Sequence, residues 1–169
     1  MQLVPHPDFP PIAVTAIETD AWRDGERWHF RFLLDGTSAL VLPDPDAPGR
    51  ADDLWKTTCF EAFVGDSSYQ EYNFSPSGQW AAYAFGSYRD ARRNSPTDAE
   101  VWLDGGETWI SLEAAITANL APGIPLGLSA MIEEEGGVKS YWALAHPPGA
   151  PDFHHRSCFA ATLPSIGAP

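Results

Sequence analysis

Residues 57–85 read TTCFEAFVGDSSYQEYNFSPSGQWAAYAF. This stretch contains three runs rich in aromatic and other apolar residues, at 57–64, 69–74 and 79–85, and Gly, Ser, Asp and Pro occupy the short segments between them. Such runs between turn-forming residues are typical of β-strands. Because both connections are short enough for hairpins, we expect the three strands to be consecutive antiparallel neighbours in one sheet.

The same pattern of strands and turns continues on both sides of this stretch. Residues 27–32 alternate strictly in polarity, which places Trp28, Phe30 and Phe32 on one face of a strand. Further strands are predicted at 12–17, 39–42, 100–103, 108–112, 126–132, 139–144 and 158–163. About ten short strands separated by turn signals predict an all-β fold, a two-sheet antiparallel β-sandwich.

Helix signals are weak throughout the chain. One short helical turn is expected at 113–120, and we expect under about a tenth of the residues to be helical. The 16 prolines and 14 glycines are spread along the chain rather than gathered in a linker. The sequence therefore predicts a single domain over residues 1–169. The acidic run 133–135 precedes a Gly-Gly pair and is predicted to be a solvated hairpin tip.

Charge and composition narrow the range of partners. Ten basic residues against 23 acidic ones give a formal net charge of −13, which repels phosphate backbones and anionic membrane surfaces. We therefore expect no nucleic-acid partner and no membrane partner. The first residues show no cationic segment followed by an apolar one, and no apolar run is long enough to span a bilayer. The expected location is cytoplasmic.

The two cysteines, Cys59 and Cys158, lie 99 positions apart and do not have the spacing of a zinc site. In a cytoplasmic protein they are expected to be reduced, and non-disulfide cysteines are usually buried. We therefore predict two buried free thiols, no disulfide and no metal site.

Motifs that indicate an enzyme are missing from the sequence. It contains no Gly-rich phosphate loop, no Gly-x-Ser-x-Gly motif and no His-Glu-x-x-His motif. Paired carboxylates can hydrolyse glycosides, but the sequence alone does not place any two of its acids across a substrate. No catalytic residue is predicted, and the chain is expected to be a binding protein rather than an enzyme.

Glu61 is the residue of the central stretch that most needs an explanation. In its strand it shares a face with Cys59 and Phe63, and an unpaired carboxylate among apolar residues is costly to bury. One interpretation is a structural acid paired with a base such as Arg89. The other is an acceptor that faces a ligand. Both remain open at the level of sequence.

The segment 54–89 closely resembles bacterial DOMON-like proteins and, more distantly, family 9 carbohydrate-binding modules. The resemblance is carried by the runs CFEAF at 59–63 and YNFSPSGQWAAY at 72–83. It continues near the C-terminus through YWALAHPPG at 141–149, PDFHHR at 151–156 and Phe159. Altogether it covers about residues 55–163, and the N-terminal third of the chain matches only loosely.

The resemblance implies a β-sandwich with a groove lined by aromatic residues, and a carbohydrate or similar polyol as its ligand. A sugar ring has an apolar face that stacks on an aromatic side chain, while its hydroxyl groups need polar partners. A Trp on a strand can equally be a core residue. The expected ligand-binding residues are the aromatic residues Trp80, Tyr83 and Trp142 as platforms, with Glu61, Asn73, Arg89 and His146 as hydrogen-bonding partners.

Two alternative functions remain. Some DOMON relatives bind haem through a Met and a His, and Met131 with His146, His154 or His155 could supply such a pair or a metal site. No bound cofactor is expected, and haem is kept as the alternative. The third possibility is a structural or protein-interaction domain without a small-molecule ligand. The sequence predicts no oligomeric state.

Overall fold

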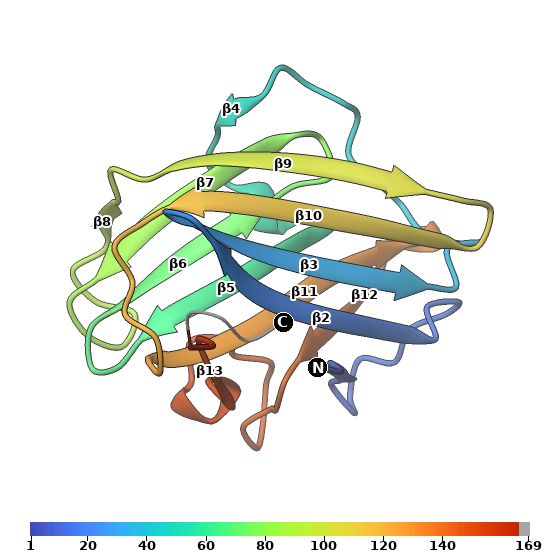
Figure 1. The fold of residues 1–169 in the computed structure, drawn as a ribbon. Coiled ribbons are helices and arrows are strands. Elements are labelled where there is room, and N and C mark those ends of the chain that lie inside the picture. The colour runs from blue at the N-terminus through green and yellow to red at the C-terminus, as the bar shows by residue number, and fades with distance from the viewer. Residues whose placement is uncertain (166–169) are drawn as a thin grey trace.

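The computed structural model describes residues 1–165, which form two β-sheets packed face to face (Figure 1). In the larger sheet the strand order is β1-β12-β11-β5-β6-β7-β4, with β13 beside β11 and β8 beside β7. These strands are β1 (Val4–Pro5), β4 (Gly49–Arg50), β5 (Cys59–Gly65), β6 (Tyr69–Phe74), β7 (Gln79–Phe85), β8 (Arg93–Asn94), β11 (Pro125–Glu134), β12 (Val138–Ala143) and β13 (Ala161–Thr162).

The smaller sheet has the strand order β2-β3-β10-β9. Its strands are β2 (Ala16–Asp24), β3 (Arg27–Asp35), β9 (Asp98–Gly105) and β10 (Trp109–Thr117). The ladders are antiparallel, except that β4 runs parallel to β7. The prediction of an all-β, two-sheet sandwich is therefore confirmed.

The helical content of residues 1–165 is small, as expected. It consists of three 3-10 turns of three residues each: η1 (Leu54–Lys56), η2 (Glu135–Gly137) and η3 (Arg156–Cys158). Across the described residues, then, there is no helix with the length and apolar character that crossing a bilayer requires.

The three central strands pair as predicted. β5 pairs with β6 and β6 with β7, both antiparallel, through the register Phe60↔Phe74 and Phe74↔Trp80. The bounds of β6 and β7 match the predicted runs 69–74 and 79–85, and β5 begins two residues later than predicted.

Several predictions outside the centre were wrong. The expected helical turn at 113–120 is instead β10 as far as Thr117, because Leu112, Ala114 and Ile116 alternate into the core with a period of two, and 118–120 are irregular. The expected strand at 39–42 makes only an isolated bridge between Leu40 and Glu134. The predicted strand at 12–17 is paired only from Ala16 onward, and that at 158–163 only over β13.

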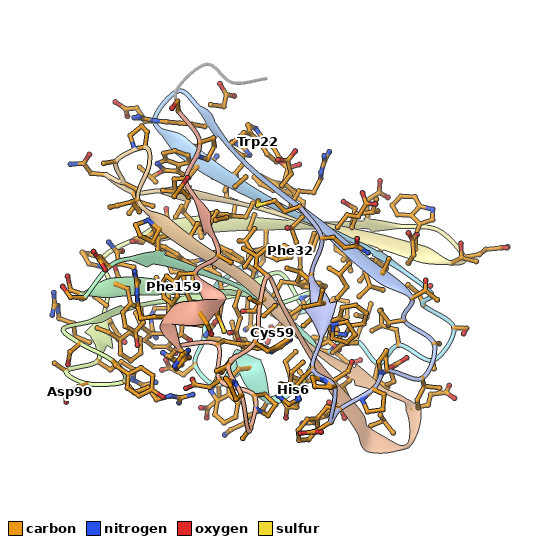
Figure 2. All side chains as sticks on the ribbon, turned by 90° about the horizontal axis from the view of Figure 1, so that it is seen from below. His6, Trp22, Phe32, Cys59, Asp90 and Phe159 are labelled. Carbon is orange, nitrogen blue, oxygen red and sulfur yellow. The ribbon has the colours of Figure 1, made fainter. Side chains whose placement is uncertain are left out.

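The main core lies between the two sheets. Trp28, Phe30 and Phe32 of β3 are fully buried there and meet Phe60 and Phe74 of the larger sheet. Phe32 packs on Phe60 with ring centroids 5.1 Å apart, and Figure 2 shows Phe32 within this layer. The aromatic residues predicted to share one face of β3 thus form the centre of the sandwich.

The larger sheet is also covered on its second face, which points away from the smaller sheet. Cys59 and Phe63 of β5 lie on this outer face and pack with Cys158 and Phe159 from the C-terminal segment. As a result, every residue of β5 is buried. Both cysteines are buried free thiols, as predicted, and burial raises the pKa of each.

The acidic run 133–135 is not a solvated hairpin tip throughout, because Glu134 is completely buried. Its Oε1 accepts hydrogen bonds from the backbone N–H groups of Ala13 and Val14 at 2.6 and 3.1 Å, and its Oε2 accepts one from Ile12 at 2.7 Å. Glu134 therefore attaches the segment before β2 to the end of β11. The donors are backbone N–H groups of a distant segment, and the periodicity of a strand does not predict such contacts.

This arrangement predicts a large difference between two neighbouring substitutions. Glu134→Ala leaves three backbone N–H groups without an acceptor and should lower the free energy of unfolding by about 3 kcal/mol or more. Glu133→Ala removes a partly exposed carboxylate that lies 4.0 Å from Lys139 Nζ, and should cost under about 1 kcal/mol. Urea unfolding of both variants measures the difference. Equal losses would show that Glu134 does not hold the N-terminal segment.

Candidate functional site

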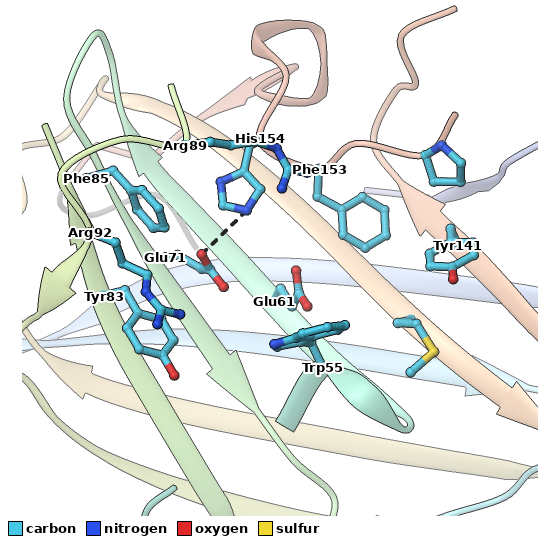
Figure 3. A pocket seen from close by; sticks show the side chains of 12 residues that line it. Trp55, Glu61, Glu71, Tyr83, Phe85, Arg89, Arg92, Tyr141, Phe153 and His154 are labelled. Carbon is cyan, nitrogen blue, oxygen red and sulfur yellow. Dashed lines mark ion pairs between the residues drawn. The ribbon is translucent and has the colours of Figure 1, made fainter. Parts of the chain in front are cut away.

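A pocket of about 480 Å³ opens on the outer face of the larger sheet. Its floor carries Glu61 and Glu71, and the half-exposed indole of Trp55 lies beside Glu61 (Figure 3). The aromatic side chains of Tyr141 and Phe153 form another part of the wall. The remaining polar side chains come from the β7–β8 connection and the C-terminal loop: Arg89, Arg92 and His154.

Strand alternation and register bring the two carboxyl groups together. Glu61 on β5 lies opposite Asn73, and Glu71 on β6 lies opposite Phe63, so the two acids are diagonal neighbours on adjacent strands. Both point to the outer face because Phe60 and Tyr72 point into the core. Glu61 is 5% exposed and Glu71 is 7% exposed, which leaves little water to solvate either charge.

Burial favours the neutral form of both acids, and the charge of Glu71 adds to this effect at Glu61. Burial raises the pKa of Glu61 well above 4.5, the negative charge of Glu71 raises it further, and Arg89 opposes the shift. Burial also raises the pKa of Glu71, against a hydrogen bond donated by Asn73 Nδ2 at 2.9 Å and the charges of Arg92 and Arg89. The pair is therefore a place where protons or cations are readily taken up.

A chain of hydrogen bonds fixes His154 above Glu71. The backbone N–H of Arg89 donates to Tyr69 Oη at 3.1 Å, and Tyr69 Oη lies 2.8 Å from His154 Nδ1. The other ring nitrogen, Nε2, faces Glu71 Oε2 at 3.7 Å. Burial lowers the pKa of His154 to about 4, with help from the charge of Arg89, so the ring is neutral at neutral pH.

Asp152 connects the C-terminal loop to the β7–β8 connection. Its Oδ1 accepts from Arg89 Nη2 at 2.7 Å and from the backbone N–H of His154 at 3.1 Å, and its Oδ2 accepts from Tyr88 Oη. Burial alone would raise the pKa of Asp152, but the hydrogen bonds from Tyr88 and Arg89 hold it below its usual value. Asp152 thus holds Arg89 and His154 over the floor.

Tyr83 and Arg92 form the wall on the β7 side. The guanidinium of Arg92 lies over the Tyr83 ring, 4.8 Å from its centroid. Tyr83 Oη donates to Asp52 at 2.6 Å, and Arg50 in turn pairs with Asp52 at 2.9 Å. Burial and Asp52 together raise the pKa of Tyr83 to about 12, so its hydroxyl stays protonated.

The structure brings together four of the seven residues expected at the site. Glu61, Tyr83 and Arg89 line the pocket, and Asn73 lies beside Glu61 beneath it. The ion pair considered between Glu61 and Arg89 is not formed, because the guanidinium of Arg89 binds Asp152.

The other three expected residues lie elsewhere. Trp80 and Trp142 are 8% and 3% exposed and pack in the core between the sheets, so their expected role as stacking platforms was wrong. Alternation explains this outcome, because both residues share a strand face with core residues. His146 does not line the pocket; its Nε2 lies 2.9 Å from the Val4 carbonyl oxygen.

The side chains considered for haem fit that group poorly. Met131 and His154 do line the same pocket, whereas His146 and His155 do not. His154 Nε2 faces the Glu71 carboxyl group at 3.7 Å, so iron bound at this nitrogen would lie against that carboxyl group. A porphyrin would also lie against the two carboxyl groups of the floor, which an apolar ring does not solvate. No cluster of three or more His, Cys, Asp or Glu within residues 1–165 could hold a metal ion.

Sequence reasoning missed several residues of the site: Trp55, Glu71, Arg92, Tyr141, Phe153 and His154 as a pocket residue. Glu71 could have been found, because it shares its strand face with Asn73 in a run whose alternation was already clear. The aromatic residue Phe153 could not, because it lies in a loop without periodicity and its place follows from tertiary contacts such as that with Tyr141.

Comparisons with known proteins add information on the fold. No family model matches the chain, and no curated protein matches it. Among solved structures, the chain is similar to a proposed carbohydrate-binding protein from Bacteroides uniformis, with a TM-score of 0.62 and 14% identity. The match covers 90% of this chain and 79% of that one. At this identity the likeness shows a shared fold, and the resemblance to DOMON-like proteins stays a prediction.

The positions of the tryptophans predict a clear division in stability. Trp80→Ala and Trp142→Ala each create a cavity in the core and should cost about 3–5 kcal/mol. Trp55 is 51% exposed, and Trp55→Ala should cost under about 1 kcal/mol. Urea unfolding monitored by circular dichroism measures all three. A large loss in Trp55→Ala would show that this indole is a structural element rather than a free wall of the pocket.

The raised pKa of Glu61 predicts how stability changes with pH. A carboxyl whose pKa is raised by folding stabilises the protein below its ordinary value of 4.5, and this contribution is lost as the pH rises through the folded-state pKa. Glu61→Gln replaces this carboxyl with an amide that does not titrate. Relative to this variant, the natural protein should lose free energy of unfolding as the pH rises above 4.5.

Urea unfolding at several pH values measures this difference. Glu18→Gln is the matched control, because it removes an exposed carboxyl on β2 of the other sheet. The expectation fails if the curves for the natural protein and Glu61→Gln stay parallel over the whole range.

Proposed function

We propose that the protein binds a short carbohydrate or similar polyol, without transforming it, in the pocket on the outer face of the larger sheet. The observation that carries the proposal is the combination of a half-exposed indole, Trp55, with the buried acids Glu61 and Glu71 in one pocket. A sugar presents an apolar ring face and a rim of hydroxyl groups, and such a site has a counterpart for each.

Trp55 is the stacking platform in this proposal. It lies in η1, directly before β5, and its ring is held from one side by Lys56 Nζ, 5.9 Å from the centroid. The exposed face of the indole is in contact with water in the free protein. A sugar ring that covers this face buries its apolar surface, which favours binding. Tyr141 and Phe153 extend the apolar wall opposite.

The hydrogen-bonding partners for a sugar lie on the floor and at the edge of the pocket. Glu61 and Glu71 on the floor accept hydrogen bonds from sugar hydroxyl groups, and a protonated carboxyl can also donate one. Arg89 and Arg92 at the edge of the pocket donate to hydroxyl or ring oxygens. Because water competes for each of these bonds, we expect a dissociation constant between roughly ten micromolar and a millimolar.

The fold of the Bacteroides uniformis protein is consistent with this proposal, since that protein is itself a proposed carbohydrate-binding protein. Two other functions have distinct signatures. A haem-binding domain would show a strong Soret band when purified. A protein-interaction domain would bind no member of a glycan array.

The decisive variant is Trp55→Ala, made in parallel with Trp102→Ala. The two indoles are similarly exposed, at 51% and 45%, but Trp102 lies on β9 of the opposite sheet. After a glycan array has identified a bound oligosaccharide, calorimetric titration should show affinity reduced at least about tenfold in Trp55→Ala and unchanged in Trp102→Ala. Melting temperatures should be nearly equal. Unchanged affinity in Trp55→Ala would place the ligand elsewhere.

A further inference from the structure

Two buried polar oxygens beside Glu61, beneath the pocket, have no hydrogen-bond partner in the described part of the chain. Asn73 is 1% exposed, and its Nδ2 donates to Glu71 while its Oδ1 has no partner in the described part of the chain. On the other side of Glu61, Ser129 of β11 is likewise 1% exposed with a partnerless Oγ. Buried acceptors without donors are rare in folded proteins, because each costs free energy.

Glu61 lies between these two groups. The register of the sheet places Asn73 and Ser129 directly opposite it on the neighbouring strands. Its carboxyl group receives no hydrogen bond from the residues that the structure describes, and only the charge of Arg89 favours its ionised form. Side by side, the three residues form a row of oxygen atoms beneath the pocket that can accept hydrogen bonds, and the Ser129 hydroxyl can also donate one.

The cations of the pocket already have other partners. Arg89 binds Asp152, and Arg92 lies over Tyr83 and acts on Glu71. Three carboxyl groups, those of Glu61, Glu71 and Asp152, therefore face two guanidinium groups, and His154 is neutral at neutral pH. The carboxyl left without its own counter-charge is that of Glu61.

The walls favour a cation as well. Aromatic faces attract ammonium groups through the negative charge of their π-systems, and the attraction strengthens where water is excluded. Trp55, Tyr141 and Phe153 all line the pocket, and Trp55 and Phe153 lie nearer to Glu61 than Tyr141 does (Figure 3). An ammonium group also brings three N–H donors, which a floor of unpaired acceptors requires.

We infer that the ligand is an amino sugar whose ammonium group binds Glu61, with Asn73 Oδ1 as a further acceptor, while its ring stacks on Trp55. This inference rests on the proposed carbohydrate binding and specifies the class of sugar. A charge-assisted hydrogen bond between ammonium and carboxylate replaces the lost hydration of Glu61. A neutral sugar satisfies the same acceptors with hydroxyl groups, but it brings no positive charge to favour the ionised form of Glu61, so the carboxyl keeps its proton.

Three β-1,4-linked tetrasaccharides that differ only at carbon 2 test the inference: glucosamine tetramer, its fully N-acetylated form, and cellotetraose. They carry ammonium, acetamide and hydroxyl groups respectively. Calorimetric titration at neutral pH should show the glucosamine tetramer bound about tenfold or more tightly than the other two. In Glu61→Gln the three affinities should converge, whereas Glu18→Gln should keep the preference. The comparison on the natural protein stands even if Glu61→Gln folds poorly.

Non-specific attraction to an acidic protein must be separated from this result. Attraction by the net charge of −13 would persist in Trp55→Ala and disappear in high salt. A specific site should lose the glucosamine tetramer in Trp55→Ala and keep most of its preference when salt is added.

Each outcome has a distinct meaning. Equal binding of all three tetrasaccharides in the natural protein overturns the amino-sugar inference and leaves carbohydrate binding standing. Binding of the glucosamine tetramer that survives Trp55→Ala also overturns the inference. If choline binds as tightly as the glucosamine tetramer while neither neutral tetrasaccharide binds, the site recognises a cation without a sugar, and the proposed function itself fails.

Discussion

The pocket depends on two carboxyl groups buried side by side, those of Glu61 and Glu71, which need hydrogen-bond donors, cations or protons from their surroundings. Adjacent strands place them on one face, and the C-terminal segment removes most of the water around them. Two like charges in such a position repel each other and are poorly solvated, so the surroundings must supply donors, cations or protons. Asn73, His154 and the arginines of the β7–β8 connection do this for Glu71, and Asp152 holds that arrangement in place.

Glu134 shows the opposite solution to the same problem. It is equally buried, yet three backbone N–H groups donate to its oxygens, so its burial ties one part of the chain to another. Within residues 1–165, by contrast, no group donates a hydrogen bond to the Glu61 carboxyl. Burying a carboxyl without hydrogen-bond partners lowers the stability of the fold. Such a group beside an open pocket is a candidate for binding a ligand that supplies the missing donors. Glu134 is therefore a structural acid, whereas Glu61 is a candidate ligand-binding acid.

The tryptophans likewise include core residues and one candidate binding residue. Trp28, Trp80 and Trp142 fill the core between the sheets and provide rigidity. Trp55 lies outside that core, on a 3-10 turn that ends just before the central strand. A platform attached to the start of a fully buried strand is held in position without being buried itself, which suits a site that must present an open ring face to a ligand.

The sequence by itself determined the class of fold, the central β5–β6–β7 meander and the two faces of each central strand, because a period of two is a local property of the chain. That same alternation could also have placed Trp80 in the core and Glu71 beside Asn73, although the resemblance implied a platform role for Trp80. Only the tertiary structure decided which side chains meet over the floor. Arg89, Phe153 and His154 lie in connections without periodicity, and their positions follow from contacts such as Arg89 with Asp152, between residues 63 positions apart. The partners of a buried charge come from wherever the folded chain brings a donor within about 3 Å, and no local pattern encodes that distance.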